Sequence, residues 1–484
     1  MSPENPVNRD WPIALPAKVV HTLRPARLQI SSAMNAREDL RVAIDAKILP
    51  WRNGGVAHAL IALLRALAEL PDGNESYRLV VSSEEEEAFW RPELRPNQDL
   101  VREKDPEPVP TRAREEPTGL RGLVAGALVG VRRWIRGPIE PVEPITPKIE
   151  RPHWPEVPIS NGFYESLDCN VLHIPWQNFI LCALPTIYNP HDLQHLHLPQ
   201  FFTPQELAWK ETMYHMGCRF AQTVVVGSQW AKDDIVRQYA LDPSKVLIIP
   251  EGSPGQLSPL PDGQTVQEVR KRYGLPETYV FYPAIIWPHK NHLRLLEALA
   301  LLRDERGLAV SLVCTGTKLE QFWPRIEKRI RELKLEHEVQ CLGFVPEADL
   351  RVIQGSAHCL VQPSLFEASS LPIFDAWLEG VPVACSRATA LPEQVGDAGL
   401  LFDPLDTRDI ADAIAKIVTN PEMRSELRTR GFHRLKDFDW NRTAKAYRAA
   451  YRRAAGLALN EEDRWLLQWN WMREPGKLPY PAVT

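Results

Sequence analysis

The feature of this sequence that most constrains its fold is an alternation of short apolar segments with longer helical patterns. Segments with the length and composition of buried strands occur at residues 41–45, 77–82, 170–174, 185–188 and 223–227. Between the first two, a helical pattern runs from Val56 to about Leu70. Strands that alternate with helices in this way predict a parallel sheet with helices packed on its faces.

The alternation starts again after a proline-rich segment at residues 257–263, which has the composition of a linker. We predict further strands at residues 279–286, 309–314, 339–344, 357–362 and 381–385, and helices at residues 293–302 and 319–335. We therefore expect an α/β fold of two doubly wound, Rossmann-like domains, over residues 39–256 and 264–440. Such domains bind ligands at the carboxyl ends of their strands, here in a cleft between the two.

Composition excludes several classes of protein. A net charge of −5 gives no reason to propose a nucleic-acid partner. The seven cysteines show no C-x-x-C spacing, and several lie in apolar strand-like segments, so we expect buried free thiols in a reducing compartment. Neither a secretory signal nor an apolar run long enough to span a bilayer is recognisable, which predicts a cytoplasmic protein.

Three segments fall outside the two α/β domains. Residues 1–38 are interpreted as a poorly ordered tail, and residues 441–484 as a helix and a tryptophan-bearing arm that packs back on the fold. The insert at residues 104–158 is rich in proline, glutamate and arginine. Within it, residues 119–136 have the apolar period of a basic amphipathic helix. This helix would lie on the inner face of a membrane as a peripheral contact, or dock as a lid or on the protein's own core.

The motif richest in chemistry is Glu367-Ala-Ser-Ser-Leu-Pro-Ile-Phe-Asp375, which places two carboxylates eight residues apart. Pro372 suits the first position of a helix and Gly380 the residue just beyond its end. The motif therefore surrounds the start of a short helix, with Asp375 about one turn inside it.

The start of that helix is a candidate phosphate site. The N–H groups near Ser370 and Leu371 would be free at the positive end of the helix dipole. Glu367 on one side and Asp375 on the other would suit the sugar and the ribose of a nucleotide diphosphate sugar. The alternative is a capped surface helix in which Asp375 only favours the dipole.

Three other segments place functional groups at strand ends. Lys290, in Trp-Pro-His-Lys-Asn-His, follows a strand and opens a helix whose N-cap is Asn291. Gly54-Gly55 lets the backbone approach a ligand closely, or forms an ordinary tight turn. His191 follows the strand at 185–188, where either a ligand-binding residue or a capped turn belongs. The sequence offers no cluster typical of a metal site, and Asp437-Phe-Asp439 is interpreted as a helix N-cap.

Together these residues resemble the retaining glycosyltransferases of the GT-B fold, specifically the group 1 family, also called family 4. The resemblance covers about residues 41–100 and 168–455. Glu367 to Asp375 is similar to the family's E-x7-E motif, and Lys290 to its diphosphate-binding lysine.

Shorter matches extend the resemblance to both halves of the chain. Gly343-Phe-Val345 resembles the family stretch beside the nucleotide base, and Gly54-Gly55 its glycine loop near the donor. His191 matches the histidine beside the transferred sugar. The sequence departs from the family pattern in the second acid, which is Asp375 where glutamate is usual, and at Ile285, where many members have an arginine.

The resemblance implies a metal-independent hexosyltransferase that needs no cofactor besides its donor. GDP-mannose is slightly favoured over a UDP-sugar, and the acceptor would be a glycan or a lipid-linked acceptor in surface polysaccharide biosynthesis. Glu367, His191 and Lys290 would be catalytic. Gly54, Gly55, Val345, Ser370, Leu371, Pro372 and Asp375 would bind the donor. The alternatives are a nucleotide-sugar epimerase and a non-catalytic nucleotide-sugar-binding protein of the same fold.

Overall fold

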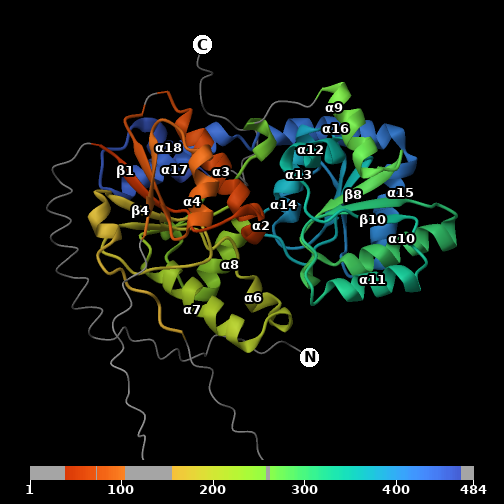
Figure 1. Cartoon of the computed structure of the whole chain (residues 1–484), viewed down its shortest axis with the longest axis horizontal. Coiled ribbons are helices and arrows are strands. Elements are labelled where there is room, and N and C mark those ends of the chain that lie inside the picture. Colours follow the sequence, from red (N-terminus) through yellow and green to blue (C-terminus); the bar gives the residue numbers. More distant parts are fainter. Residues whose placement is uncertain (1–38, 72, 104–154, 258–261, 470–484) are drawn as a thin grey trace, which may run out of the picture. The chain divides into compact units, whose positions relative to one another are not determined.

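The computed structural model describes residues 39–71, 73–103, 155–257 and 262–469. The predicted tail at 1–38, the amphipathic helix at 119–136 and Trp471 of the terminal arm lie outside these ranges. The described residues form two parallel sheets in one compact unit, each flanked by helices (Figure 1). The expected pair of doubly wound α/β sheets is confirmed.

The first sheet has seven strands in the order β3-β2-β1-β4-β5-β6-β7, all paired in parallel. Its strands are β1 (Arg41–Asp45), β2 (Ser76–Val81), β3 (Gln98–Arg102), β4 (Val171–Ile174), β5 (Thr186–Tyr188), β6 (Thr223–Val226) and β7 (Val246–Ile248). Its helices are α2 (Pro50–Asn53), α3 (Gly55–Ala68), α4 (Glu84–Trp90), α6 (Gln194–His197), α7 (Pro204–Phe220) and α8 (Gln229–Tyr239). The strand order reverses between β1 and β4.

The second sheet has six parallel strands in the order β10-β9-β8-β11-β12-β13. Its strands are β8 (Tyr279–Pro283), β9 (Ser311–Thr315), β10 (Val339–Cys341), β11 (Cys359–Gln362), β12 (Val383–Ser386) and β13 (Leu400–Phe402). Its helices are α9 (Gly263–Tyr273), α10 (His292–Arg306), α11 (Trp323–Glu332), α12 (Glu347–Gly355), α13 (Leu371–Leu378), α14 (Leu391–Val395), α15 (Thr407–Thr419) and α16 (Pro421–Leu435). The order reverses between β8 and β11, the point at which a doubly wound sheet binds its ligand.

The last two helices, α17 (Trp440–Ala454) and α18 (Glu461–Gln468), pack on the first sheet although they follow the second in sequence. Tyr447 and Tyr451 of α17 are buried in the core that β1, β2 and α3 share. The Tyr447 hydroxyl accepts a hydrogen bond from Asn189 at 2.6 Å, and the Tyr451 hydroxyl lies 2.8 Å from Nδ1 of His173. The C-terminal helices therefore complete the core of the N-terminal sheet.

Several predicted elements are shorter than the sequence suggested, and two of them show why. The helix expected from residue 319 begins only at Trp323, because Pro324 is accommodated in a first turn but not in a helix interior. The strand expected at 339–344 ends at Cys341, and Gly343 takes a positive φ of 76°. All seven cysteines are free thiols, and five of them are buried. Within the described ranges, no helix has the length and apolar character of a membrane span.

Gly431 allows α16 to approach α13, the helix of the Glu367–Asp375 motif. A Cβ at residue 431 would lie 2.4 Å from Cδ1 of the buried Trp377. We therefore expect Gly431→Ala to lower the free energy of unfolding by about 1–3 kcal/mol through overpacking. Gly263→Ala is the matched control, since a Cβ there meets no atom within 4 Å. Equal midpoints of urea unfolding for Gly431→Ala and Gly263→Ala would contradict this packing.

Candidate active site

Lys290 and Glu367 form an ion pair at the carboxyl ends of the two strands where the second sheet reverses its order. Lys290 ends the short turn after β8, and Glu367 lies in the loop after β11. Nζ of Lys290 donates to Oε1 of Glu367 at 2.6 Å, and the two side chains are only 19% and 10% exposed. Gln362 donates a second bond to the same oxygen at 2.8 Å. The two residues assigned to the diphosphate and to the sugar are thus adjacent.

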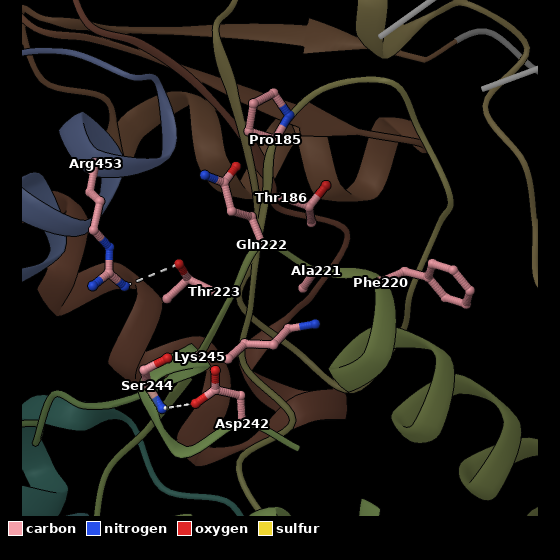
Figure 2. A pocket seen from close by; sticks show the side chains of 10 residues that line it. All are labelled: Pro185, Thr186, Phe220, Ala221, Gln222, Thr223, Asp242, Ser244, Lys245 and Arg453. Atoms are coloured by element: carbon pink, nitrogen blue, oxygen red, sulfur yellow. Dashed lines mark hydrogen bonds between the residues drawn. The ribbon is translucent and has the colours of Figure 1, made fainter. Parts of the chain in front are cut away.

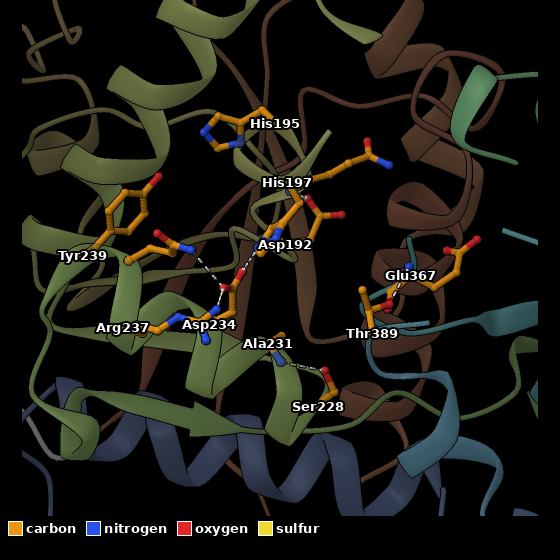
Figure 3. A network of polar contacts seen from close by, with 12 residues as sticks. Asp192, His195, His197, Ser228, Ala231, Asp234, Arg237, Tyr239, Glu367 and Thr389 are labelled. Atoms are coloured by element: carbon orange, nitrogen blue, oxygen red, sulfur yellow. Dashed lines mark hydrogen bonds and ion pairs between the residues drawn. The ribbon is translucent and has the colours of Figure 1, made fainter. Parts of the chain in front are cut away.

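The backbone of Glu367 is held by Thr389, on the loop after β12. The Glu367 N–H donates to Oγ1 of Thr389 at 2.9 Å, and that hydroxyl donates back to the Glu367 carbonyl at 2.5 Å (Figure 3). Thr389 has a φ of 50°, a left-handed conformation that is uncommon for a β-branched residue. This reciprocal pair fixes the direction in which the Glu367 side chain leaves the loop.

The start of α13 differs from the sequence-based expectation. Ser370 occupies the N-cap, but its N–H donates to Oε1 of Gln394 at 2.9 Å, while Nε2 of Gln394 donates to the Ser370 carbonyl. The prediction that this amide is free was therefore wrong. The N–H of Leu371 has no partner among the described residues and remains the candidate phosphate donor. Pro372 is the second helical residue, not the first, and Gly380 lies just beyond the helix end with a φ of 69°.

Asp375 is held by the segment that connects the two sheets. Its Oδ1 accepts a hydrogen bond from Oγ of Ser253 and a longer one, 3.5 Å, from the N–H of Gly255. Burial raises the pKa of Asp375 to about 6, although the bonds from Ser253 and Gly255 oppose the shift. Only Oδ2 has no partner among the described residues and is left to accept a further bond.

Contacts across the two sheets bring the glycine loop to the same place. Gly54 has a φ of 53°, and a Cβ there would lie 3.3 Å from Cδ1 of Ile285, the residue that stands where many family members have arginine. A Cβ on Gly55 would lie 3.7 Å from Cδ1 of Leu371. The N-terminus of α3 therefore approaches the start of α13, and the absence of side chains at both glycines leaves the backbone accessible there.

His191 also has a left-handed backbone, with a φ of 64°. Its Nε2 lies 2.9 Å from the carbonyl oxygen of Pro175. A carbonyl oxygen only accepts, so Nε2 donates this bond, and Nδ1 is the ring nitrogen without a partner among the described residues. The ring orientation is thus set by the loop that follows β4.

Val345 is buried in the core of the second sheet, with 5% of its surface exposed, whereas the neighbouring Phe344 is 59% exposed. The side chain of Val345 is therefore occupied by packing. Any contact that this stretch makes to a nucleotide base would come from its backbone or from Phe344.

Sequence reasoning missed a cation on the first sheet. The ammonium of Lys210, on α7, lies 5.3 Å and 5.4 Å from the ring centres of Phe202 and Tyr214. Burial lowers the pKa of Lys210. The charges of Lys290 and Lys210 add to the effect of burial in lowering the pKa of His289. Lys210 is thus a second positive charge near the Lys290 segment, and its helical surroundings gave no sequence signal.

A second missed feature is a carboxylate that joins the two halves. Glu393 of α14 accepts hydrogen bonds from the N–H groups of Gln229 and Trp230, at 2.7 Å and 3.1 Å, at the start of α8. Burial raises its pKa, while these two bonds oppose the shift. Trp230 also packs against Phe366, the neighbour of Glu367, at 5.3 Å between ring centres. The position of Glu393 after β12, at the carboxyl edge of the sheet, was the signal that could have found it.

A cavity of the first sheet lies away from these residues. It has a volume of about 590 Å³ and lies at the amino ends of β5, β6 and β7 (Figure 2). None of the predicted site residues lines it. Within the described ranges, no three histidine, cysteine, aspartate or glutamate residues are grouped so as to hold a metal ion.

Residues 266–434, from α9 to α16, match the family described as "Glycosyl transferases group 1". This segment contains Lys290, Glu367 and Asp375. Residues 266–434 therefore form a group 1 glycosyltransferase domain. Group 1 is a family of retaining, metal-independent enzymes.

Relatives of this glycosyltransferase include several mannosyltransferases. It is 28% identical over 265 residues to the O-antigen chain mannosyltransferase B of Escherichia coli, covering 53% of this chain and 68% of that protein. It is 31% identical over 231 residues to an MMP α-(1→4)-mannosyltransferase of Mycolicibacterium hassiacum, covering 47% of this chain and 53% of that protein. A D-inositol 3-phosphate glycosyltransferase of Corynebacterium glutamicum is 26% identical, covering 48% and 57%. The matches thus span roughly half to two thirds of these relatives.

Solved structures agree on the fold. HepE of Anabaena, in complex with UDP and glucose, superposes with a TM-score of 0.60 at 16% identity, covering 85% of this glycosyltransferase and 99% of that chain. WaaG, a glycosyltransferase involved in lipopolysaccharide biosynthesis, gives 0.57 at 14% identity, covering 86% and 100%. The expected GT-B fold is confirmed.

Thr389 should act as a positioning residue for Glu367. We expect Thr389→Val to lower the free energy of unfolding by about 1–3 kcal/mol, because it leaves the partly buried Glu367 amide without its partner. The Glu367 carbonyl loses one bond and keeps the one from the N–H of Ala390. Thr389→Ser keeps the hydroxyl and should restore both the stability and the affinity for donor nucleotide. Urea unfolding would measure the stability and calorimetry the affinity for donor nucleotide. An equal loss of affinity in both variants would show that the hydroxyl does not position Glu367.

Asp375 should make stability depend on pH. Its raised pKa means that the folded protein binds the proton more tightly than the unfolded chain does. In the unfolded chain, aspartate has a pKa of about 3.9. Its contribution is therefore fully present below about pH 4 and lost as the pH rises through about 6. Relative to Asp375→Asn, which does not titrate, the wild type should lose on the order of 1–3 kcal/mol of unfolding free energy between about pH 4 and 7. The expectation would be contradicted if urea unfolding gave the same difference in unfolding free energy between the wild type and Asp375→Asn at every pH.

Proposed function

We propose that this glycosyltransferase transfers a hexose from a nucleotide diphosphate sugar to a hydroxyl group, with retention of the anomeric configuration. The observation that carries the proposal is the Lys290–Glu367 pair at the switch point of the second sheet. A cation and a carboxylate 2.6 Å apart suit two adjacent parts of such a donor, the diphosphate and the sugar hydroxyls.

Negative charge develops on the diphosphate as the sugar leaves, so catalysis needs positive groups fixed where that charge appears. We assign this role to Lys290 and to the Leu371 N–H at the start of α13. The ion pair holds Lys290 in place before the donor binds, which reduces the reorganisation needed at the moment of reaction.

The remaining residues are assigned to the sugar and the ribose. Glu367 would accept hydrogen bonds from sugar hydroxyls, and Nδ1 of His191 would accept one from the transferred sugar. Oδ2 of Asp375 would accept from the ribose, because Oδ1 is already bonded to Ser253 and Gly255. Gly54 and Gly55 would allow the N-terminus of α3 to approach the donor.

GDP-mannose is the favoured donor, from which mannose would be transferred. A UDP-sugar is the alternative donor. The mannosyltransferases of Escherichia coli and Mycolicibacterium hassiacum support the first, and HepE, whose structure contains UDP, supports the second. The Escherichia coli relative is named for the O-antigen chain, which supports a glycan or lipid-linked acceptor of surface polysaccharide biosynthesis.

Removing either partner of the ion pair should abolish most activity. We expect Lys290→Ala and Glu367→Ala to reduce the rate of transfer by about 10²–10³-fold, as removal of one transition-state contact does elsewhere. Lys416→Ala, which removes an exposed lysine from the end of α15, is the control and should be as active as the wild type. Near-wild-type turnover in a folded Lys290→Ala or Glu367→Ala protein would overturn the site assignment.

A thermal-shift screen of nucleotides tests which donor the protein binds. A ligand that binds only the folded protein raises its thermal midpoint in proportion to its affinity. With GDP, UDP and ADP at equal concentrations, we expect the largest shift with GDP, and no shift for any of them in Lys290→Ala. A larger shift with UDP would replace GDP-mannose by a UDP-sugar. Proton NMR of the donor incubated without acceptor would reveal an epimerised sugar, which has the same mass as the original, if the protein were instead an epimerase.

A further inference from the structure

The cavity at the amino ends of β5, β6 and β7 is lined mainly by polar and charged side chains (Figure 2). Strands of a parallel sheet present their carboxyl ends at one edge, where the candidate active site lies, so this cavity is at the opposite edge of the first sheet. Its lining includes Thr186, Gln222, Thr223, Asp242, Lys245 and Arg453. Nothing in the proposed transfer reaction uses these residues.

Two of the lining side chains are cations without a carboxylate partner among the described residues. Arg453, near the end of α17, donates to Oγ1 of Thr223 at 3.3 Å (Figure 2). Lys245 donates to the carbonyl of Arg219 at 2.6 Å. Among the described residues, no carboxylate oxygen lies within 4.0 Å of either group. Most partly buried arginines of this chain are paired, as Arg452 is with Glu75 and Asp463.

The burial of Arg453 and Lys245 disfavours their charged forms, which an anion bound in the cavity would stabilise. Burial lowers the pKa of Arg453, and no nearby charge opposes it. Burial is also the main cause that lowers the pKa of Lys245, and the charge of Arg219 adds to it. An anion that entered the cavity would favour both charged forms.

Asp242 is the one carboxylate in the lining, and it is already engaged. Its Oδ1 accepts the N–H of Ser244 at 2.9 Å, and these contacts with Ser244 lower its pKa. It therefore caps its own turn and does not neutralise Lys245 or Arg453. The Gln222 side chain is exposed beside them, with an amide that is able to donate.

We infer that this cavity binds a phosphate group, carried by a molecule of the size of a sugar phosphate or by a lipid headgroup. The guanidinium of Arg453 offers a planar fork that matches phosphate, and Lys245 adds a point charge. A volume of about 590 Å³ is within the usual range for ligand sites and larger than one phosphate needs. The inference is independent of the transfer reaction at the other edge.

Binding would be measured on the full chain with excess GDP present, so that the donor site is filled. The soluble probe is glycerol 3-phosphate, followed by calorimetry. The lipid probe is a phosphatidylcholine vesicle with and without phosphatidylglycerol, followed by co-sedimentation. We expect the wild type to bind at least one probe, and Arg453→Met and Lys245→Met to bind it about tenfold or more weakly. Lys416→Met removes the same charge from the exposed end of α15 and should bind as the wild type does.

The outcomes separate the two sources of phosphate. Binding of glycerol 3-phosphate that is lost in both variants identifies a free phosphorylated ligand, and loss of phosphatidylglycerol binding alone identifies a headgroup. Thermal unfolding without probe shows whether each variant is folded, and Arg453→Met leaves the bond from Lys245 to α7 intact. If the wild type binds neither probe, or if both variants bind like Lys416→Met, the inference is overturned.

Discussion

The ion pair between Lys290 and Glu367 is the interaction around which the candidate active site is organised. The two residues are 77 positions apart in the chain, yet β8 and β11 are neighbours at the point where the second sheet reverses its order. Two opposite charges in a largely buried place are stable only if further bonds satisfy them. Gln362 provides one to the carboxylate, and Thr389 fixes the backbone of Glu367.

The other candidate donor-binding groups are also held by protein partners. Gln394 bonds the amide of Ser370, and Ser253 bonds Asp375. A donor would therefore meet a preformed arrangement in which single atoms, such as the Leu371 N–H and Oδ2 of Asp375, are left to bind it. The bond from Ser253 also connects α13 to the segment between the sheets, so the ionisation of Asp375 is coupled to how the two halves are joined.

Sequence patterns predicted most strands of both sheets, because buried parallel strands are short apolar runs that alternate with helices. They also predicted that Lys290, Gly54 and His191 lie at strand ends. Two of the errors have specific physical causes. Pro324 shortened a helix, and the side chain of Gln394, more than twenty residues away, took the Ser370 amide. Distant partners of this kind leave no periodic signal in a sequence.

By itself the sequence determined the alternation of strands and helices, the order of the functional residues and the resemblance to group 1 glycosyltransferases, since these depend on local pattern and spacing. Only the tertiary structure decided which residues meet. It paired Lys290 with Glu367, packed α17 on the first sheet and joined Glu393 to the start of α8. It also placed Arg453 and Lys245 in one cavity, with no carboxylate partner in the described part of the chain. Each of these depends on contacts between segments far apart in the chain, which are fixed by the strand order and the packing of the helices.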